Sequence, residues 1–230
     1  MSESTDKKYV SAFDLFTKSV DLIKENLQLF AIVNSIPLLM TLLSALNGSK
    51  GGEFAVDSAS GALSVNWAAV LGVSLGVGAV LVVVSAVLQT MALRLELDVA
   101  KGTKTTLSKL WEFCQKYFFR LLGLGFIMAL FIGAGLILLV VPGIILITRY
   151  FFAPYVMIDE NLGIFASLKR SSELSKDNWG AIWSVIGVTL LVSFVPTFIG
   201  KIGEVIAALL GIAYSVAPAL RYLEVKKASK

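Results

Sequence analysis

Residues 121–148 read LLGLGFIMALFIGAGLILLVVPGIILIT, a run without a charged side chain. A helix needs about 20 apolar residues to cross the ~30 Å hydrocarbon core of a bilayer. Pro142 and Gly143 interrupt the run, and both residues disfavour a continuous helix. We therefore predict two helices joined by a tight hairpin at Pro142-Gly143. One kinked helix over 121–148 is the alternative.

Further uncharged runs lie at residues 26–49, 58–93, 178–200 and 205–220. Backbone groups in lipid must bond within their own segment, so these runs predict helices. The expected fold is all-α: a polytopic helical membrane bundle with about six spans, at 27–46, 67–92, 121–141, 144–158, 180–200 and 202–220. Residues 1–230 then form one integral membrane domain, with a cytoplasmic amphipathic N-terminal segment 1–26, a six-span bundle 27–220 and a cytoplasmic tail 221–230.

The distribution of Lys and Arg predicts the orientation of these spans. With a cytoplasmic N-terminus, 17 of the 20 basic residues fall on the inner side. Only Lys50 and Lys201 fall outside, and Arg149 lies within a span. Positively charged loops resist translocation, so we expect a multi-pass protein of the plasma (cytoplasmic) membrane with both termini inside.

The composition excludes several classes of activity. The chain is 57% hydrophobic and 16% charged, with mean hydropathy +0.81. It has no histidine and one cysteine, Cys114, which excludes internal disulfides, Cys/His zinc sites and Ser-His-Asp triads. We expect no enzyme activity, no catalytic residue, no metal and no cofactor. The net charge of +4 follows from topology and predicts no nucleic-acid partner; the expected partners are membrane lipids, other membrane proteins or further copies of the chain.

An internal repeat relates residues 13–26 to residues 165–178. Identical pairs include Phe13/Phe165, Ser19/Ser171, Lys24/Lys176 and Asn26/Asn178. Each copy precedes a predicted span, and Ser11 with Asp14 forms a capping pattern. The repeat predicts two cytoplasmic amphipathic helices, and residues 107–118 predict a third. Such helices lie in the headgroup zone, where they sense lipid, dock a partner or merely cover the bundle.

Arg149 is the most unusual residue, because a charge within a span is costly and marks a candidate functional site. Glu204 lies near the same outer end of the bundle, so we predict an Arg149–Glu204 pair or a shared polar pocket. Pro154 would kink the helix that holds Arg149. Asp159 and Glu160 are paired carboxylates at the inner edge, and we expect both to be solvated.

Residues 142–183 resemble a known family. The matching features are Pro142-Gly143, Arg149, Ala153-Pro154, Asp159-Glu160, and residues 166–171 leading to Asn178-Trp179. They resemble the membrane domain associated with some bacterial glycerophosphodiester phosphodiesterases and the related YciC-like multi-pass membrane proteins. The resemblance implies a helical membrane bundle. In fused members, hydrolysis belongs to a separate barrel with acidic and histidine residues, so the resemblance does not extend the diesterase activity to this histidine-free chain.

Two functions follow from these observations as expectations. The first is a non-enzymatic multi-pass membrane protein that acts as a scaffold or lipid-interacting membrane module. The second is a small transporter or export component with a polar pocket around Arg149. An intramembrane hydrolase is disfavoured, because the sequence offers no recognisable nucleophile–base pair.

Overall fold

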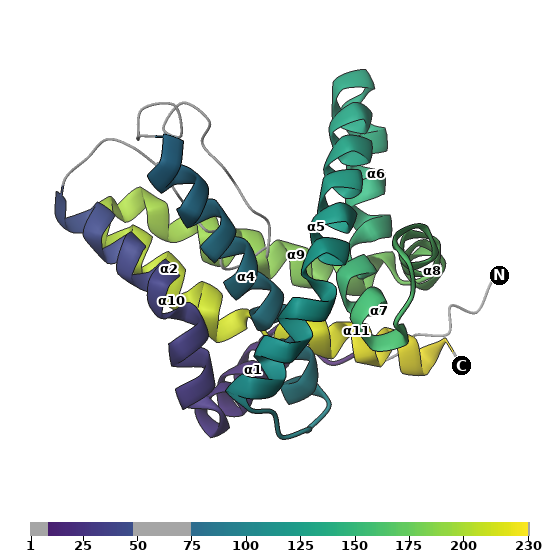
Figure 1. The fold of residues 1–230 in the computed structure, drawn as a ribbon. Helices are drawn as coiled ribbons and strands as arrows, with labels where there is room; N and C mark the ends of the chain where they lie inside the picture. Colours follow the sequence, from purple (N-terminus) through teal and green to yellow (C-terminus); the bar gives the residue numbers. More distant parts are fainter. Residues whose placement is uncertain (1–8, 48–74, 230) are drawn as a thin grey trace.

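The computed structural model describes residues 9–47 and 75–229, and every regular element within them is a helix. This confirms the all-α class. Residues 48–74, which include the start of the predicted span 67–92, lie outside the described residues. Figure 1 shows the helices in chain order: α1 (Ala12–Glu25), α2 (Leu27–Asn47), α4 (Leu75–Ala100), α5 (Leu107–Leu138), α6 (Val140–Tyr150), α7 (Ala153–Glu160), α8 (Ile164–Lys176), α9 (Trp179–Phe194), the 3₁₀ helix η1 (Val195–Ile199), α10 (Lys201–Tyr214) and α11 (Ala217–Ala228).

The two repeat segments form α1 and α8, and each helix turns sharply into the apolar helix that follows. α1 meets α2 at 100° and α8 meets α9 at 103°. The repeat-related Asn26 and Asn178 stand at these junctions and donate to the carbonyls of Leu22 (3.0 Å) and Leu174 (2.7 Å). These bonds satisfy carbonyls that a helix end leaves unpaired. The predicted cap is also present, since the Asp14 amide donates to Ser11 Oγ at 3.1 Å.

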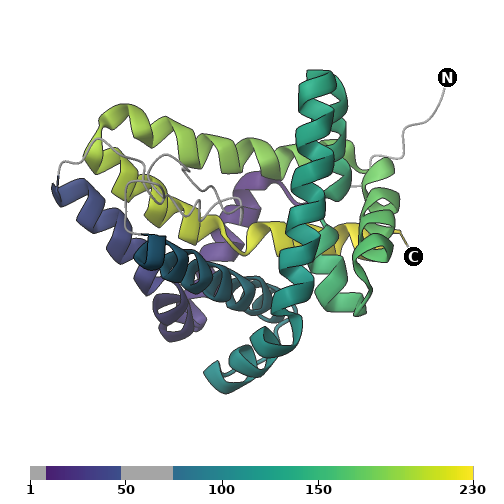
Figure 2. The same cartoon turned by 45° about the horizontal axis from the view of Figure 1, so that its top comes forward.

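α5 and α6 form an antiparallel hairpin, which Figures 1 and 2 show as two rods side by side. The chain reverses at Leu139, whose backbone is extended, and not at Pro142-Gly143. Pro142 instead lies in the first turn of α6, where a missing amide costs no helical hydrogen bond. Gly143 and Gly135 allow the two rods to approach. A Cβ on Gly143 would lie 2.9 Å from the backbone nitrogen of Leu136, and a Cβ on Gly135 would lie 3.1 Å from the Gly143 backbone.

The predicted amphipathic helix over 107–118 is not separate from the span that follows it. α5 continues without interruption from Leu107 to Leu138. No proline lies between residues 107 and 138, and Gly123 and Gly125 are tolerated within the helix. The physical reason for the correction is therefore the absence of a strong helix-breaking signal where the amphipathic pattern gives way to the apolar one.

The described residues include three helical stretches long and apolar enough to cross a membrane. They are Leu107–Leu138, Val140–Glu160 and Lys201–Ala228, and the number rises to five if each bent pair counts as one span. The predicted count of six spans is not confirmed. The second and third stretches are interrupted at Phe151-Phe152 and Ser215-Val216.

Buried side chains gather in two main cores. One joins α1, α2, α4 and α10 through residues such as Leu15, Phe30, Leu95 and Tyr214. The other joins α7, α9 and α11 through Phe152, Ile182 and Tyr222, among others. α11 contributes to both cores, so most of the predicted tail 221–230 is a packed helix with Arg221, Tyr222 and Val225 buried.

Candidate functional site

Two helix interruptions share a sequence pattern and a supporting contact. Tyr150-Phe151-Phe152-Ala153-Pro154 joins α6 to α7, and Tyr214-Ser215-Val216-Ala217-Pro218 joins α10 to α11. Both have the form Tyr-x-x-Ala-Pro, and we call them the first and second breaks. Proline at the start of α7 and α11 removes an amide donor, which explains why neither helix continues unbroken.

A repeat-related serine binds the helix before each break. Ser171 of α8 donates through Oγ to the Arg149 carbonyl at 2.7 Å. Ser19 of α1 donates in the same way to the Ala213 carbonyl at 2.7 Å. Both carbonyls belong to the last turn of their helix, where carbonyls have no amide donor within the helix. Both serines are fully buried. Each amphipathic helix is thus hydrogen-bonded to the helical turn that precedes one break.

Asp159, at the end of α7, binds groups from two other helices. Its carboxylate accepts from the Tyr222 hydroxyl at 2.8 Å and from Lys226 at 2.5 Å, and it also pairs with Lys101 just after α4. Its side chain is only 8% exposed, so the expectation that Asp159 is solvated is wrong. The reason is that α4 and α11 bring two cations to it from distant parts of the chain.

Glu160 extends this charged cluster to α8. It pairs with Lys226 at 2.9 Å and with Arg170 at 3.6 Å, and Arg170 also lies 3.4 Å from Glu173. Together with Asp159, Lys101 and Tyr222, these residues tie α4, α7, α8 and α11 to one another. Oppositely charged groups arranged in this way suit the positioning of helices.

Glu96 of α4 accepts a 3.0 Å hydrogen bond from the Tyr155 hydroxyl of α7, and the Tyr155 ring stacks on Tyr222. Glu96 lies beyond the predicted span 67–92. Burial raises the pKa of Glu96 to about 8, because desolvation disfavours the carboxylate, and the Tyr155 hydrogen bond opposes this shift only in part. At neutral pH this carboxyl group is therefore mostly protonated.

Arg221 of α11 lies beside the second break and is 1% exposed. It donates to the Val10 carbonyl at 2.8 Å and to Ser184 Oγ at 3.2 Å, and it pairs with Glu224 at 2.8 Å. The Tyr9 ring also lies 5.6 Å from its guanidinium carbon. This buried arginine fixes the chain segment that precedes α1.

The predicted outer pocket is not assembled in the described residues. Arg149 on α6 and Glu204 on α10 are both exposed. Among the ion pairs of residues 9–47 and 75–229, none joins Arg149 to Glu204. The pairing was inferred with the helix starting at Ile144, whereas α6 starts at Val140, which places Arg149 deeper along it. Pro154 belongs to the first break, and Pro142 and Gly143 to the first turn of α6. A functional role for Arg149 or Glu204 stays a prediction.

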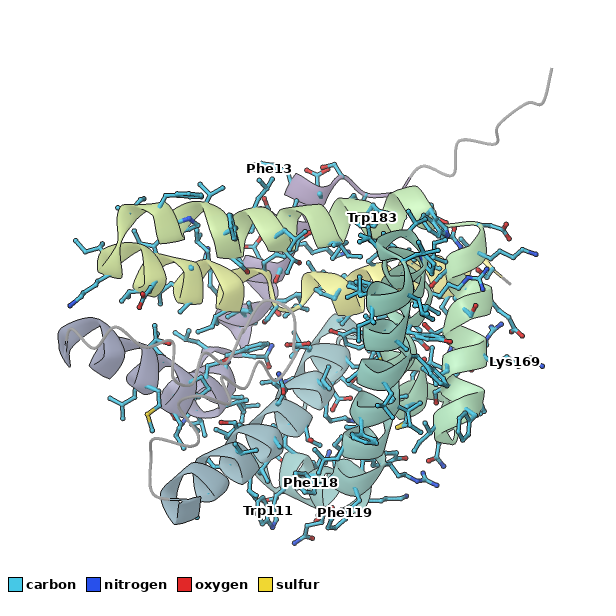
Figure 3. The ribbon with its side chains drawn as sticks, turned by 90° about the horizontal axis from the view of Figure 1, so that it is seen from above. Phe13, Trp111, Phe118, Phe119, Lys169 and Trp183 are labelled. Atoms are coloured by element: carbon cyan, nitrogen blue, oxygen red, sulfur yellow. The ribbon has the colours of Figure 1, made fainter. Side chains whose placement is uncertain are left out.

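The side chains that point away from the bundle include several aromatics. Figure 3 shows Phe13 at one edge of the molecule, and Trp111 and Phe119 at the opposite edge. Phe13 and its repeat counterpart Phe165 are 76% and 68% exposed. In the described part of the chain, no group of three or more acidic or cysteine side chains lies close enough to hold a metal ion.

The break motif becomes visible in the sequence only when Pro154 is compared with Pro218, and the prediction above concerns Pro154 alone. The shift of the chain that aligns Pro154 with Pro218 differs from the shift that aligns Phe13 with Phe165. No single shift therefore aligns both the break motif and the amphipathic segment. The contacts of Asp159 and Arg221 left no comparable signal, since their partners come from distant helices.

Comparisons with known proteins support a membrane family. A UPF0259 membrane protein of Pectobacterium carotovorum subsp. carotovorum (strain PC1) is 30% identical over 106 residues, covering 43% of this chain. The chain spans 42% of the length of that curated relative. No solved structure matches. The model of an uncharacterised protein family, UPF0259, matches residues 65–217.

These matches support an uncharacterised membrane-protein family, and they do not support the association with glycerophosphodiester phosphodiesterases. The helical membrane bundle that the resemblance implied is consistent with the apolar helices described above. Since the family match covers more than half of the sequence, the chain belongs to the uncharacterised protein family UPF0259.

Proposed function

We propose that this protein is a non-enzymatic, lipid-interacting membrane module whose helix α8 binds anionic headgroups. The observation that carries the proposal is the 103° angle between α8 and the apolar helix α9. If α9 crosses the bilayer, α8 lies along its surface. An amphipathic helix in that position buries its apolar side chains at the acyl boundary and holds its charges among the headgroups.

The exposed side chains of α8 fit this environment. Phe165 stands at the start of the helix, and Lys169 and Lys176 are exposed along it. Within the described residues, neither lysine takes part in an ion pair, and Figure 3 shows Lys169 pointing away from the ribbon. Lysines near an anionic bilayer surface each contribute about 1 kcal/mol of attraction.

The repeat-related α1 provides an internal control, because it is also an amphipathic helix at a sharp bend but carries one more acidic than basic side chain. Its Lys18 and Lys24 are accompanied by Asp14, Asp21 and Glu25 on the exposed side, and Lys24 lies 3.6 Å from Asp21. We therefore assign the preference for anionic lipid to α8 rather than α1.

Thermal stability of the purified chain in detergent tests this proposal. Added phosphatidylglycerol should raise Tm more than phosphatidylcholine does. The double variant Lys169→Ala/Lys176→Ala should lose most of that difference, while Lys18→Ala/Lys24→Ala on α1 should retain it. An equal rise in Tm with both lipids, or equal losses in the two double variants, would contradict the proposal.

A further inference from the structure

The tip of the α5–α6 hairpin lacks the residues of a turn in water. Ile137, Leu138, Leu139, Val140 and Val141 follow one another and are between 63% and 87% exposed. Turns that face water are dominated by Gly, Asn, Asp, Ser and Pro. The turn between η1 and α10 shows that pattern, because Gly200 has a φ of 73° and exposed Lys201 follows it. The hairpin tip is thus suited to a hydrocarbon environment.

The hairpin is also short when measured from the surface helix α8. Figure 1 shows α8 almost along its axis, while α5 and α6 run up the page. Ser171 of α8 binds the Arg149 carbonyl, so Arg149 marks the depth of α8 on the hairpin. Leu139 lies ten residues from Arg149, or about 15 Å at 1.5 Å per residue, and half the diameter of α8 adds ~5 Å. The resulting ~20 Å falls short of the ~30 Å hydrocarbon core.

The second break gives a comparison for this estimate. Ser19 of α1 binds the Ala213 carbonyl, and Gly200 lies thirteen residues before Ala213, about 20 Å along α10. With ~5 Å for half of α1, that arm reaches ~25 Å. Lys201 at its end can extend its flexible stem to the opposite headgroups. Leu139 lies at a shorter distance from its surface helix and has no polar side chain with which to reach the opposite headgroups.

We propose that the α5–α6 hairpin is re-entrant: it enters the acyl chains from the side on which α8 lies and returns to the same side, with Leu139 inside the hydrocarbon. Its partner is the lipid tails of a bilayer, and its bulk is inserted mainly into one leaflet. In this arrangement Arg149 lies at the headgroup level rather than at mid-bilayer, which removes the cost of a charge in hydrocarbon. The inference rests on the surface placement of α8 proposed above.

Nitroxide depth measurements on the full chain in phosphatidylcholine–phosphatidylglycerol vesicles test the inference. Leu130→Cys and Leu139→Cys are made in a Cys114→Ala background, because both leucines are exposed and Cys114 is the single native cysteine. In the re-entrant arrangement, a spin label at 139 lies deeper than a label at 130. It should therefore lose accessibility to a water-soluble nickel chelate and gain accessibility to oxygen relative to the label at 130.

A fully spanning hairpin predicts the reverse order, with residue 130 near mid-bilayer and residue 139 at the far headgroups, and that order would overturn the inference. A third label at Lys169→Cys reports on α8 independently, because the surface placement puts this exposed side chain among the headgroups. If this label is shielded from the nickel chelate, the surface placement of α8 fails, and the order of labels 130 and 139 still decides whether the tip is buried.

Discussion

The first and second breaks share a sequence pattern and a serine–carbonyl hydrogen bond, and they differ in the charged residues around them. Each has the Tyr-x-x-Ala-Pro pattern, and a buried serine of an amphipathic helix binds a carbonyl in the turn before it. Beyond the first break, α7 ends in Asp159 and Glu160, which join the charged cluster with Lys101, Lys226 and Arg170. Beyond the second break, α11 instead buries Arg221. The two breaks therefore share their backbone geometry, and each has its own set of charged contacts.

The difference is sharpest at matched positions, which are found by aligning Pro154 with Pro218. Met157 in α7 then corresponds to Arg221 in α11, and Asp159 corresponds to Leu223. Met157 is fully buried among Leu124, Ala153 and Leu168. The first break therefore has an apolar side chain at the position where the second break has a buried cation. Substitutions that exchange or remove these residues test which contacts each break requires.

The largest effect is expected from Arg221→Met, which gives the second break the residue of the first. The change removes the bonds to Val10 and Ser184 and leaves Glu224 without its partner. Removing one member of a buried ion pair is strongly destabilising, and we expect a loss of about 3 kcal/mol in the free energy of unfolding. Tm in detergent measures this loss, and faster proteolysis near Val10 should accompany it. Lys227→Met, at an exposed position of α11, is the control. Equal Tm values for the two variants would show that Arg221 is dispensable.

A smaller loss in the free energy of unfolding, about 2 kcal/mol, is expected from Asp159→Asn, because hydrogen bonds to charged groups are typically worth about 1.5–3 kcal/mol. The amide keeps a partner for the Tyr222 hydroxyl and loses the charge that holds Lys101 and Lys226. The loss is moderated because both lysines are partly exposed. Thermal unfolding in detergent measures it, and Asp177→Asn, on an exposed residue after α8, should leave Tm unchanged. If both variants unfold alike, the charged cluster does not stabilise the first break.

The sequence was sufficient to predict local structure and insufficient for contacts between distant helices. The repeat of Phe13–Asn26 in residues 165–178 predicted α1 and α8, because an amphipathic pattern acts within one helix. The serines of these helices bind the backbone carbonyls of Ala213 and Arg149. Every residue has a backbone carbonyl, so the sequence does not indicate which of them accepts such a bond. Asp159 was expected in solvent because adjacent acids at a helix end are usually solvated, and only the packing of α4 and α11 around it reverses that expectation.

The hairpin illustrates the same division. The interruption near Pro142 was visible in the sequence, and the antiparallel packing of α5 and α6 agrees with it. The position of the reversal was not visible, because proline also fits the first turn of a helix. Placing the start of α6 at Ile144 instead of Val140 changed the depth of Arg149 and brought it into a predicted pair with Glu204.

The two serines should differ in importance, since only one of them has a substitute. Among the described residues, Ser19 is the one side chain that donates to the Ala213 carbonyl, whereas the Arg149 carbonyl also accepts from Ser175 Oγ at 3.3 Å. A buried hydrogen bond contributes about 1 kcal/mol, so Ser19→Ala should lower the unfolding free energy by about that amount. Ser171→Ala should cost less, and Ser171→Ala/Ser175→Ala should approach Ser19→Ala. Denaturant titration in detergent measures the order, and a Ser171→Ala loss as large as that of Ser19→Ala would refute the role given to Ser175.

At acidic pH the smallest effect is expected from Glu96→Gln, which tests a feature of the first break that the second break lacks. Tyr155 binds Glu96 there, and the corresponding residue of the second break is Ala219. The pKa of Glu96 is raised from 4.5 to about 8, so between these pH values the folded chain retains a proton that the unfolded chain has released. Stability therefore falls as pH rises through this window, and it is independent of this group below pH 4.5. Glutamine resembles the protonated acid, so the variant should match the native chain below pH 4.5. Its stability advantage should grow as the pH rises from 4.5 to about 8 and stay constant above that. Tm measured across that range decides the matter, and parallel pH profiles for the two chains would show that Glu96 is ionised when folded.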